Sequence, residues 1–542
     1  MSTNLSKQKR DDLLSKISAI RTFISAAPQD ENTGNLLNYL SDLERDVNGK
    51  KYGLVFEEHQ EAIDTVLAEH TPVLTEEPEL LIDNGGEMNF LLEGDNLAAL
   101  QLLEKTHRGK IDLIYIDPPY NRRKSNDFIY DDNYVNAEDS FIHSKWISFM
   151  SKRLYIAKRL LAQHGCIFIS CDDNEIGTLR LLCDEIFDEK NFQGHIHWRR
   201  RHNQPNDKNK LIGLVAEHIL VYSKDKDAHK SYGIGKIATT GDFVNPDNDP
   251  LGPWTTKPWK AARGRGGCKY TITTPTGKKL TETWYGTEES FFDNIEKGRV
   301  HWTKNGNGIP RIKVYQFEAE EDGQCATNWW PNDLFGCNQD ATDELKFLFD
   351  NVSPFDNPKP TSLIKAIVNL GYVGTSGTIL DFFAGSGTTG DAVLQLNQQG
   401  KSFKFILCTN NENNICRNVT YERIKRVIER EGYVASLKYY RIDYVPINEQ
   451  LYYEYADELL RHVRELVELE NGVNFIENAE IAIVLTDEEL AGFIAHPEAF
   501  AKCRTLYLGH DILPTGEQDA LLKEREIMVH IIPDYYYREL EG

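Results

Sequence analysis

Short apolar runs alternate with helical stretches in two separate parts of this chain, and this alternation constrains the fold more than any other feature. Buried parallel strands are continuous apolar runs, and amphipathic helices make the connections between them. The predicted strands span 111–116, 166–170, 378–380 and 403–408, and the predicted helices span 146–162 and 421–431, with another ending at residue 396. We therefore predict an α/β fold in which both parts contribute strands to one mostly parallel sheet.

The stretch between the two parts is irregular and rich in Gly, Trp and Arg, which indicates an inserted module. Near the N-terminus, apolar residues at helical spacing are interrupted at Ala27-Pro28-Gln29-Asp30, a pattern typical of a helical hairpin. The tail has a small strand-helix-strand pattern of its own. The predicted segments are 1–50 for the N-terminal helices, 51–223 and 353–445 for the two parts of the sheet domain, 224–352 for the inserted module, and 446–542 for an acidic C-terminal domain.

Charge is distributed unevenly along the chain. The formal net charge of -23 disfavours binding to phosphate, which attracts Lys and Arg. Residues 196–270, however, contain 14 Lys and Arg against 7 Asp and Glu, a net +7. Residues 451–542 contain 7 against 20, a net -13. The middle of the chain can therefore face a polyanion, although the protein as a whole is acidic.

Composition excludes several classes of protein. No run approaches the roughly 20 apolar residues that cross a bilayer, and the first residues lack the apolar core of a signal peptide. We therefore expect a cytoplasmic protein with no membrane partner. The nine cysteines include no Cys-x-x-Cys pair, so we expect reduced thiols and no metal site.

Asp117-Pro118-Pro119-Tyr120 directly follows the apolar run 111–116, at the strand end where open α/β sheets form their ligand crevice. The two prolines stiffen the turn, so that the Asp117 carboxylate and the Pro118 carbonyl can face one direction. These two acceptors match the two N–H donors of an exocyclic amine, and Tyr120 could stack on the base. The same four residues would also serve as a rigid turn that ends a strand.

A glycine-rich turn follows the strand at 378–380, in the sequence Asp381-Phe382-Phe383-Ala384-Gly385-Ser386-Gly387-Thr388-Thr389-Gly390. Glycine lets the backbone approach a ligand closely. The turn satisfies G-x-G-x-x-G, and Glu412 stands about where a dinucleotide fold has its ribose-binding acid. A nicotinamide-dependent oxidoreductase is therefore an alternative. The absence of a Gly-Lys-Ser/Thr ending excludes a P-loop.

Taken in this order, the two motifs resemble those of the β-class amino methyltransferases, and most closely the modification subunits of Type III restriction-modification systems. The resemblance extends from about residue 51 to 444. It implies a Rossmann-like fold with circularly permuted motif order, S-adenosylmethionine as cofactor, and a target-recognition domain between the motifs. Asp at the first position of the tetrapeptide is typical of adenine N6 as the methyl acceptor, so the resemblance implies site-specific methylation of double-stranded DNA at that atom.

The resemblance also implies roles for individual residues. Asp117, Pro118, Pro119 and Tyr120 would be catalytic, Asp95 and Asp172 would lie near the cofactor, and Glu412 would be its ribose ligand. Lys359 and Pro360 would border the methionine part of the cofactor. The floor beneath it would be formed by Asp381, Phe383, Gly385 and Gly387. No metal is implied.

Cations and aromatic residues of the middle stretch are candidates for DNA contacts. The candidate cations are Arg199, Arg200, Arg201, Lys208, Lys210, Arg263 and Arg265, and Trp254 and Trp259 lie among them. Each could instead belong to a solvated loop or to local packing. A buried adenine cannot reach a methyl donor, so a duplex substrate requires base flipping.

The resemblance implies a homodimer and a possible helicase-nuclease (Res) partner. Leu459, Val463, Leu466 and Leu469 could form a partner-binding helix face or pack on their own domain. A recognition subunit that has lost methylation activity is a further alternative. Binding of S-adenosylmethionine would separate a methyltransferase from an oxidoreductase. An Asp117→Ala variant that loses activity but keeps DNA binding would separate a methyltransferase from an inactive recognition subunit.

Overall fold

The computed structural model describes residues 5–26, 33–48, 56–121, 142–204, 211–237, 242–447, 459, 461–474, 479–509 and 512–532. The chain divides into two compact units, residues 1–57 and 58–542. Lys208 and Lys210 of the predicted DNA contacts lie outside the described residues.

The first unit is the helical hairpin that the sequence predicts. It consists of α1 (Leu5–Ala26) and α2 (Thr33–Asn48). Ile17 and Leu40 are buried within the pair, and the Arg21 guanidinium forms an ion pair of 2.8 Å with Glu44. The predicted break at residues 27–30 lies outside the described residues; α1 ends at Ala26 and α2 begins at Thr33.

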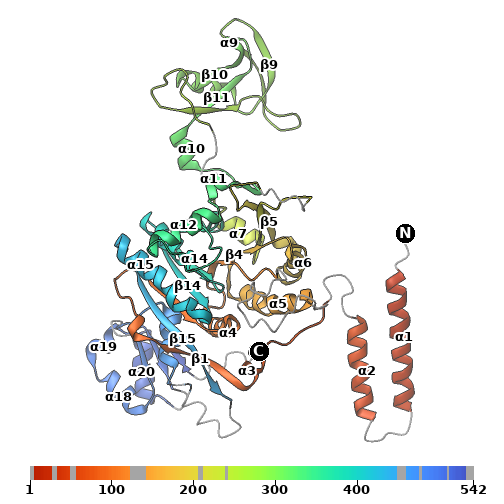
Figure 1. Ribbon diagram of the computed structural model, residues 1–542, viewed down its shortest axis with the longest axis vertical. Coiled ribbons are helices and arrows are strands. Elements are labelled where there is room, and N and C mark those ends of the chain that lie inside the picture. Colours follow the sequence, from red (N-terminus) through yellow and green to blue (C-terminus); the bar gives the residue numbers. More distant parts are fainter. Residues whose placement is uncertain are drawn as a thin grey trace. The chain divides into compact units, whose positions relative to one another are not determined.

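A ten-stranded sheet forms the centre of the second unit, with the order β1-β15-β2-β14-β13-β3-β4-β6-β5-β12 (Figure 1). Its strands are β1 (His70–Glu76), β2 (Met88–Glu93), β3 (Ile111–Ile116), β4 (Leu161–Cys171), β5 (Phe192–Arg199), β6 (Ala216–Ser223), β12 (Trp329–Trp330), β13 (Ser376–Asp381), β14 (Ser402–Thr409) and β15 (Ser436–Pro446). The strands from β15 to β4 are parallel, and β6 is antiparallel to both of its neighbours. The prediction of one mostly parallel sheet assembled from two distant stretches is confirmed.

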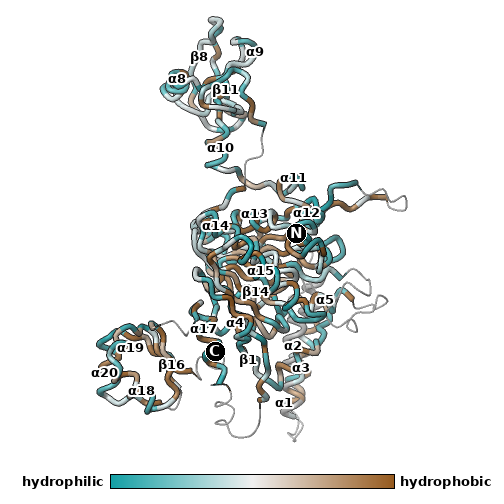
Figure 2. Tube along the Cα trace, turned by 60° about the vertical axis from the view of Figure 1, so that its left-hand side comes forward, coloured by the Kyte–Doolittle hydropathy of each residue, from teal (hydrophilic) through white to brown (hydrophobic). Residues whose placement is uncertain are grey.

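Strands from the two stretches lie next to each other at the centre of the sheet. Leu113 of β3 pairs with Ile379 of β13, and both side chains are fully buried. The buried positions of these strands are mainly apolar because helices cover both faces of the sheet. Figure 2 shows hydrophobic chain at β14, in the middle of this layer. Burying so many apolar side chains fixes the register of the strands, and with it the positions of the loops at their ends.

The helices form two series. One series is α4 (Asn96–His107), α5 (Ile142–Leu160) and α6 (Ile176–Phe187), and the other is α13 (Thr361–Gly371), α14 (Thr388–Gln398) and α15 (Glu422–Glu431). A π-helical turn, Cys416–Tyr421, leads into α15. The remaining short elements of the sheet domain are α3 (Ala62–Glu69), α7 (Lys226–Tyr232), α10 (Gln316–Asp322), α11 (Asn332–Phe335), α12 (Asn338–Leu348), and 3-10 turns at Pro78–Leu80, Glu189–Asn191 and Glu412–Asn414.

The stretch predicted as an inserted module contains a hydrophobic core of its own, formed by Trp259, Ile272, Trp284, Phe291 and Ile312. Its elements are β7 (Trp254–Pro258), β8 (Cys268–Thr273), β9 (Lys279–Trp284), α8 (Glu288–Glu296), β10 (Val300–Trp302), α9 (Thr303–Gly306) and β11 (Pro310–Tyr315). The chain then returns to the central sheet, where Trp329 and Trp330 pair in parallel with β5.

The tail begins with α17 (Val463–Asn471), which contacts α4 and β1. The four apolar residues considered for partner binding, from Leu459 to Leu469, are all buried. We therefore assign this face to packing within the chain. A three-stranded parallel sheet follows, with β16 (Ile481–Val484), α18 (Asp487–Ile494), α19 (Pro497–Lys502), β17 (Thr505–Leu508), α20 (Gly516–Glu524) and β18 (Met528–Ile531). Among the described helices, none combines the length and apolar character that crossing a membrane requires.

Candidate active site

The tetrapeptide and the glycine turn line the same cavity, as the sequence predicts. Strands β3 and β13 are parallel neighbours, so Asp117 and Asp381 stand at the same edge of the sheet. The connections diverge here: β13 is followed by β14 on one side, and β3 by β4 on the other, which creates a switch point. The cavity encloses about 840 Å³, including space open to solvent at its mouth.

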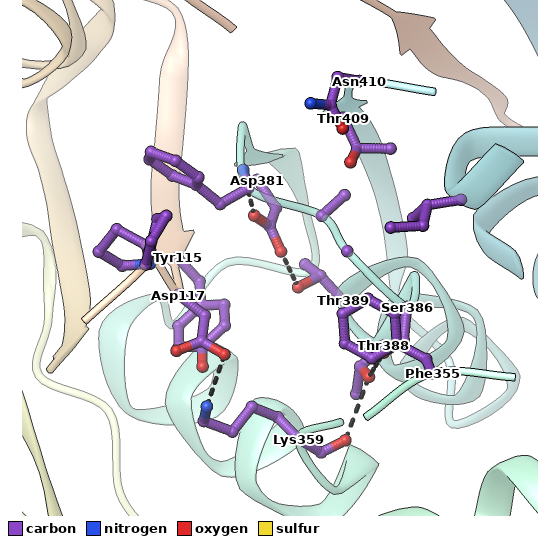
Figure 3. A pocket seen from close by; sticks show the side chains of 16 residues that line it. Tyr115, Asp117, Phe355, Lys359, Asp381, Ser386, Thr388, Thr389, Thr409 and Asn410 are labelled. Atoms are coloured by element: carbon purple, nitrogen blue, oxygen red, sulfur yellow. Dashed lines mark hydrogen bonds and ion pairs between the residues drawn. The ribbon is translucent and has the colours of Figure 1, made fainter. Parts of the chain in front are cut away.

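Lys359 binds the catalytic candidate Asp117 directly. Its Nζ lies 2.5 Å from Asp117 Oδ2 and 3.1 Å from the Tyr120 hydroxyl, and Figure 3 shows it reaching across the cavity from below. The Tyr120 hydroxyl donates to the other carboxylate oxygen of Asp117. The indole N–H of Trp146 donates to the Pro119 carbonyl at 2.7 Å, which fixes the turn from the side of α5. Both oxygens of Asp117 are therefore held in a defined orientation.

Behind Lys359 lies a second carboxylate, Glu217 of β6, whose side chain is 3% exposed. Its Oε2 is 3.4 Å from Lys359 Nζ, and its Oε1 is 3.0 Å from Arg200 Nη1. Burial alone would lower the pKa of Lys359, but Asp117 and Glu217 outweigh it and the pKa is raised. Lys359 therefore stays charged, and charges alternate in sign from Arg200 through Glu217 and Lys359 to Asp117.

Asp381 is a buried carboxyl at the end of β13. The backbone N–H of Phe383 donates to its Oδ1 at 2.9 Å, and the hydroxyl of Thr389 donates to its Oδ2 at 2.5 Å (Figure 3). Burial raises the pKa of Asp381 to about 7, although both hydrogen bonds lower it. The cavity therefore contains a carboxyl group whose charge changes near neutral pH.

Gly385 forms the part of the turn closest to Phe355. Its φ of +46° lies in the left-handed region, and a Cβ at this position would come 3.1 Å from Phe355 Cζ. The hydroxyl of Thr420 donates to the Gly385 carbonyl at 2.6 Å. Glycine thus keeps the turn close to the cavity while leaving the space above it open.

The cavity gathers some of the predicted site residues and not others. Asp117, Pro118, Pro119, Lys359, Asp381, Phe383 and Gly385 line it. Tyr120 is buried beside it, with its ring 5.4 Å from Lys359 Nζ. The predicted cofactor residues Asp95, Asp172, Pro360, Gly387 and Glu412 are not among the lining residues. Asp95 instead caps α4 by accepting from the N–H of Leu97, and the roles predicted for these five residues stay predictions.

The predicted DNA contacts also separate into groups. Arg263, Arg265 and Arg201 are exposed. Arg199 donates to the backbone carbonyls of Arg201 and His202. The Arg200 side chain is only 13% exposed and is paired with Glu217, and its predicted phosphate contact stays a prediction. Trp254 and Trp259 are buried, which assigns them to packing.

Several residues of the site escaped the sequence analysis. Glu217 stands in a strand pattern that gives no sign of its contact with Lys359, since this contact depends on how distant segments pack. Phe355 and Thr389 line the cavity as well. For Thr389, the available signal was its place in the glycine turn that follows Asp381. A hydroxyl residue that follows a strand-ending acid can donate a hydrogen bond to it.

The fold and the site together define a Rossmann-like enzyme with a ligand cavity at the switch point of its sheet. Residues 111–422 match the family described as DNA methylase. The chain belongs to this DNA methylase family. The matched region begins at β3 and includes the tetrapeptide, the module and the glycine turn.

Curated relatives agree with this assignment. The Type III restriction-modification enzyme StyLTI Mod subunit of Salmonella typhimurium is 36% identical over 378 residues, which are 64% of this chain and 57% of the relative. The EcoP15I Mod subunit of Escherichia coli is 28% identical over 60% of this chain and 58% of its own length. The Type II methyltransferase M.KpnI of Klebsiella pneumoniae is 32% identical over 65% of this chain and 90% of its own. The match thus spans less than two thirds of each Mod subunit.

Proposed function

We propose that this protein transfers a methyl group from S-adenosylmethionine to the N6 amino group of adenine in double-stranded DNA, at a specific site. The observation that carries the proposal is the cavity shared by Asp117 and the turn at Gly385. One wall offers acceptors for an amine, and the other offers a carboxyl and a glycine turn for a cationic donor. We further propose that the protein is the modification subunit of a restriction-modification system, acts as a homodimer and can bind a helicase-nuclease (Res) subunit, as the similarity to Mod subunits suggests.

The residues of the cavity fit S-adenosylmethionine. Asp381 supplies a buried carboxylate for a ligand with a positive charge, and Phe383 supplies an apolar surface. A Cβ at Gly385 would occupy the space beside Phe355 that a ligand would use. When bound, S-adenosylmethionine supplies an electrophilic methyl group.

Asp117 and the Pro118 carbonyl would accept the two N–H bonds of the amine, which leaves the nitrogen lone pair free to attack. Lys359 orients the Asp117 carboxylate by donating to Oδ2. The nitrogen would form a bond to the methyl carbon as the bond between that carbon and the donor sulfur breaks, and the extra proton of the amine would pass to water, with S-adenosylhomocysteine as the second product. Alignment of the two reactants supplies much of the acceleration. Adenine is proposed over cytosine because the tetrapeptide begins with Asp.

DNA would be held by the exposed cations of the module, among them Arg263 and Arg265. Since the acceptors of Asp117 lie in a cavity, the target base would have to leave the duplex, which costs a few kcal/mol. The module would read the flanking sequence.

Expression of the full chain in cells that lack N6-methyladenine tests the proposal. Long-read sequencing of their DNA should show N6-methyladenine at one recurrent sequence. Asp117→Ala should abolish the modification, while purified variant protein still binds S-adenosylmethionine.

Asp112→Asn is the matched control, because Asp112 lies at the opposite end of the same strand, where it accepts from the backbone N–H of Thr378. It should retain methylation. N4-methylcytosine in place of N6-methyladenine would refute the choice of base, and unmodified DNA together with no S-adenosylmethionine binding would refute the reaction itself.

A further inference from the structure

Three histidines gather on the strand pair β5–β6, outside the cavity described above. His195 and His197 are two residues apart in β5, so both side chains leave the same face of the strand. His218 of β6 is the cross-strand partner of His197. One ring nitrogen from each imidazole lies within 4.8 Å of the others.

The opposite face of these strands anchors the cluster. Ile196, Trp198 and Ile219 alternate with the histidines and belong to the main hydrophobic core. The backbone beneath the three imidazoles is therefore fixed by packing, which is the preorganisation that a binding site requires. His195 and His197 are half-buried, and the His218 side chain is 13% exposed.

A carboxylate fixes the orientation of one ring. His218 Nε2 lies 3.1 Å from Asp173 Oδ1, so that nitrogen carries the proton and donates it. The other nitrogen, Nδ1, then has its lone pair directed at His195 Nε2, 3.0 Å away. Ligating histidines almost always donate their second N–H to a carboxylate or carbonyl in this way.

We propose that His195, His197 and His218 bind a divalent transition-metal ion of the zinc type. Imidazole nitrogen suits zinc, and three histidines with a water in the open fourth position form a known class of zinc site. Tetrahedral zinc with Zn–N bonds of about 2.05 Å separates its ligand nitrogens by about 3.3 Å. The 3.0 Å between His195 and His218 lies close to this value, so small ring rotations complete the geometry. Asp173 would act as the outer partner of His218.

This site differs from the methylation site in place and in chemistry. His218 directly follows Glu217, but the two side chains leave opposite faces of β6, one toward the imidazole cluster and the other toward Lys359. The metal would therefore hold the start of β6 in place and take no part in methyl transfer. Its test needs no methylation assay, so it can fail or succeed independently of the proposed function.

Untagged full-length protein is freed of metal with a chelator, dialysed and titrated with Co²⁺, followed by Zn²⁺ competition. We expect one Co²⁺ per chain, visible absorption bands of a four-coordinate site, and their loss when Zn²⁺ displaces Co²⁺. The thermal unfolding midpoint should rise with Zn²⁺, because the ion binds only the folded protein. No bound ion in the wild-type protein would overturn the proposal.

Variants locate the ion. His195→Ala combined with His197→Ala should abolish binding, and Asp173→Asn, which removes no ligand, should weaken it by about tenfold or more. His202→Ala is the matched control, since His202 stands in a second group with Cys337 and Asp340 and should leave binding unchanged. Binding that survives the double variant would overturn the proposal. Should the double variant fail to fold, as judged by circular dichroism, unchanged binding in Asp173→Asn would do so instead.

Discussion

S-adenosylmethionine should bind about tenfold more weakly at pH 6 than at pH 8, because of Asp381. The pKa of this cavity carboxyl is raised to about 7, chiefly by burial, so it is largely protonated at pH 6 and ionised at pH 8. If the cationic donor binds the ionised form, the apparent Kd scales as one plus the ratio of protonated to ionised carboxyl. That factor is about 11 at pH 6 and about 1.1 at pH 8. The affinity therefore rises with pH and levels off above the folded-state pKa.

Other groups in the cavity do not produce this dependence. The pKa values of Lys359 and Tyr115 are raised above their ordinary high values, so both groups keep their protons between pH 6 and 8. Titration calorimetry with S-adenosylmethionine and S-adenosylhomocysteine tells whether the pH dependence comes from the positive charge on sulfur or from the amino and carboxylate groups of the ligand. S-adenosylhomocysteine has the same amino and carboxylate groups but an uncharged sulfur. Titration of Asp381 between pH 6 and pH 8 should therefore change its Kd by less than about twofold.

Asp381→Asn removes the titrating group and keeps one acceptor oxygen for the Phe383 N–H, while its amide N–H can donate to the Thr389 hydroxyl. Its affinity for S-adenosylmethionine should be low and nearly the same at pH 6 and pH 8. An unchanged Kd between the two pH values in the wild-type protein would refute the reasoning. So would a tenfold change that persists in Asp381→Asn, because the carboxyl would then not be its source.

Three further predictions concern other parts of the site. Gly385→Ala should weaken S-adenosylmethionine binding by roughly tenfold in calorimetry, because a Cβ at φ of +46° and 3.1 Å from Phe355 would shift the turn that lines the cavity, at a cost of about 1 to 2 kcal/mol. Gly400→Ala has a similar backbone penalty at φ of +90°, but Gly400 does not line the cavity, so this matched control should bind normally. Lys359→Met should lower the rate of DNA methylation by about a hundredfold, and normal methylation would contradict the positioning role. It should also lower the free energy of unfolding in urea by about 2 kcal/mol. This loss is smaller than for a fully buried pair because the carboxylate partner is 26% exposed. Arg263→Ala should reduce the slope of log affinity for DNA against log salt by about 1, whereas Arg200→Ala should slow methylation and leave that slope unchanged.

The sequence was sufficient to predict the sheet and the pairing of its two motifs. Parallel strands place their carboxyl ends at one edge, so the positions of Asp117 and Asp381 directly after apolar runs imply a common crevice. The hydrophobic pattern located the central strands, and β3 begins and ends where the apolar run does. The boundary between α5 and β4 was wrong, because the helix predicted over 146–162 spans Ile142–Leu160 and β4 already begins at Leu161. These features depend on local pattern and on one general rule of topology.

Contacts between distant segments could not be predicted in the same way. Arg200 belongs to a run of three arginines that is typical of a phosphate-binding loop, but strand pairing places it beside Glu217. Trp254 and Trp259 are of a residue type that often contacts bases, yet they pack inside the module. The cluster of His195, His197 and His218 had a sequence signal, which is the His-x-His pattern in a strand. Cysteine spacing alone does not reveal this pattern.

The central sheet combines strands from two distant stretches of the chain, and this determines when the protein becomes active during synthesis. β3 emerges from the ribosome early, but its neighbour β13 and the Lys359 that orients Asp117 are translated only after the whole module. A nascent chain that ends before β13 has one wall of the cavity and an unpaired central strand edge, which is prone to association with other chains. Methylation capacity should therefore appear in a single late step of translation, and chains truncated within the module should be inert and dependent on chaperones.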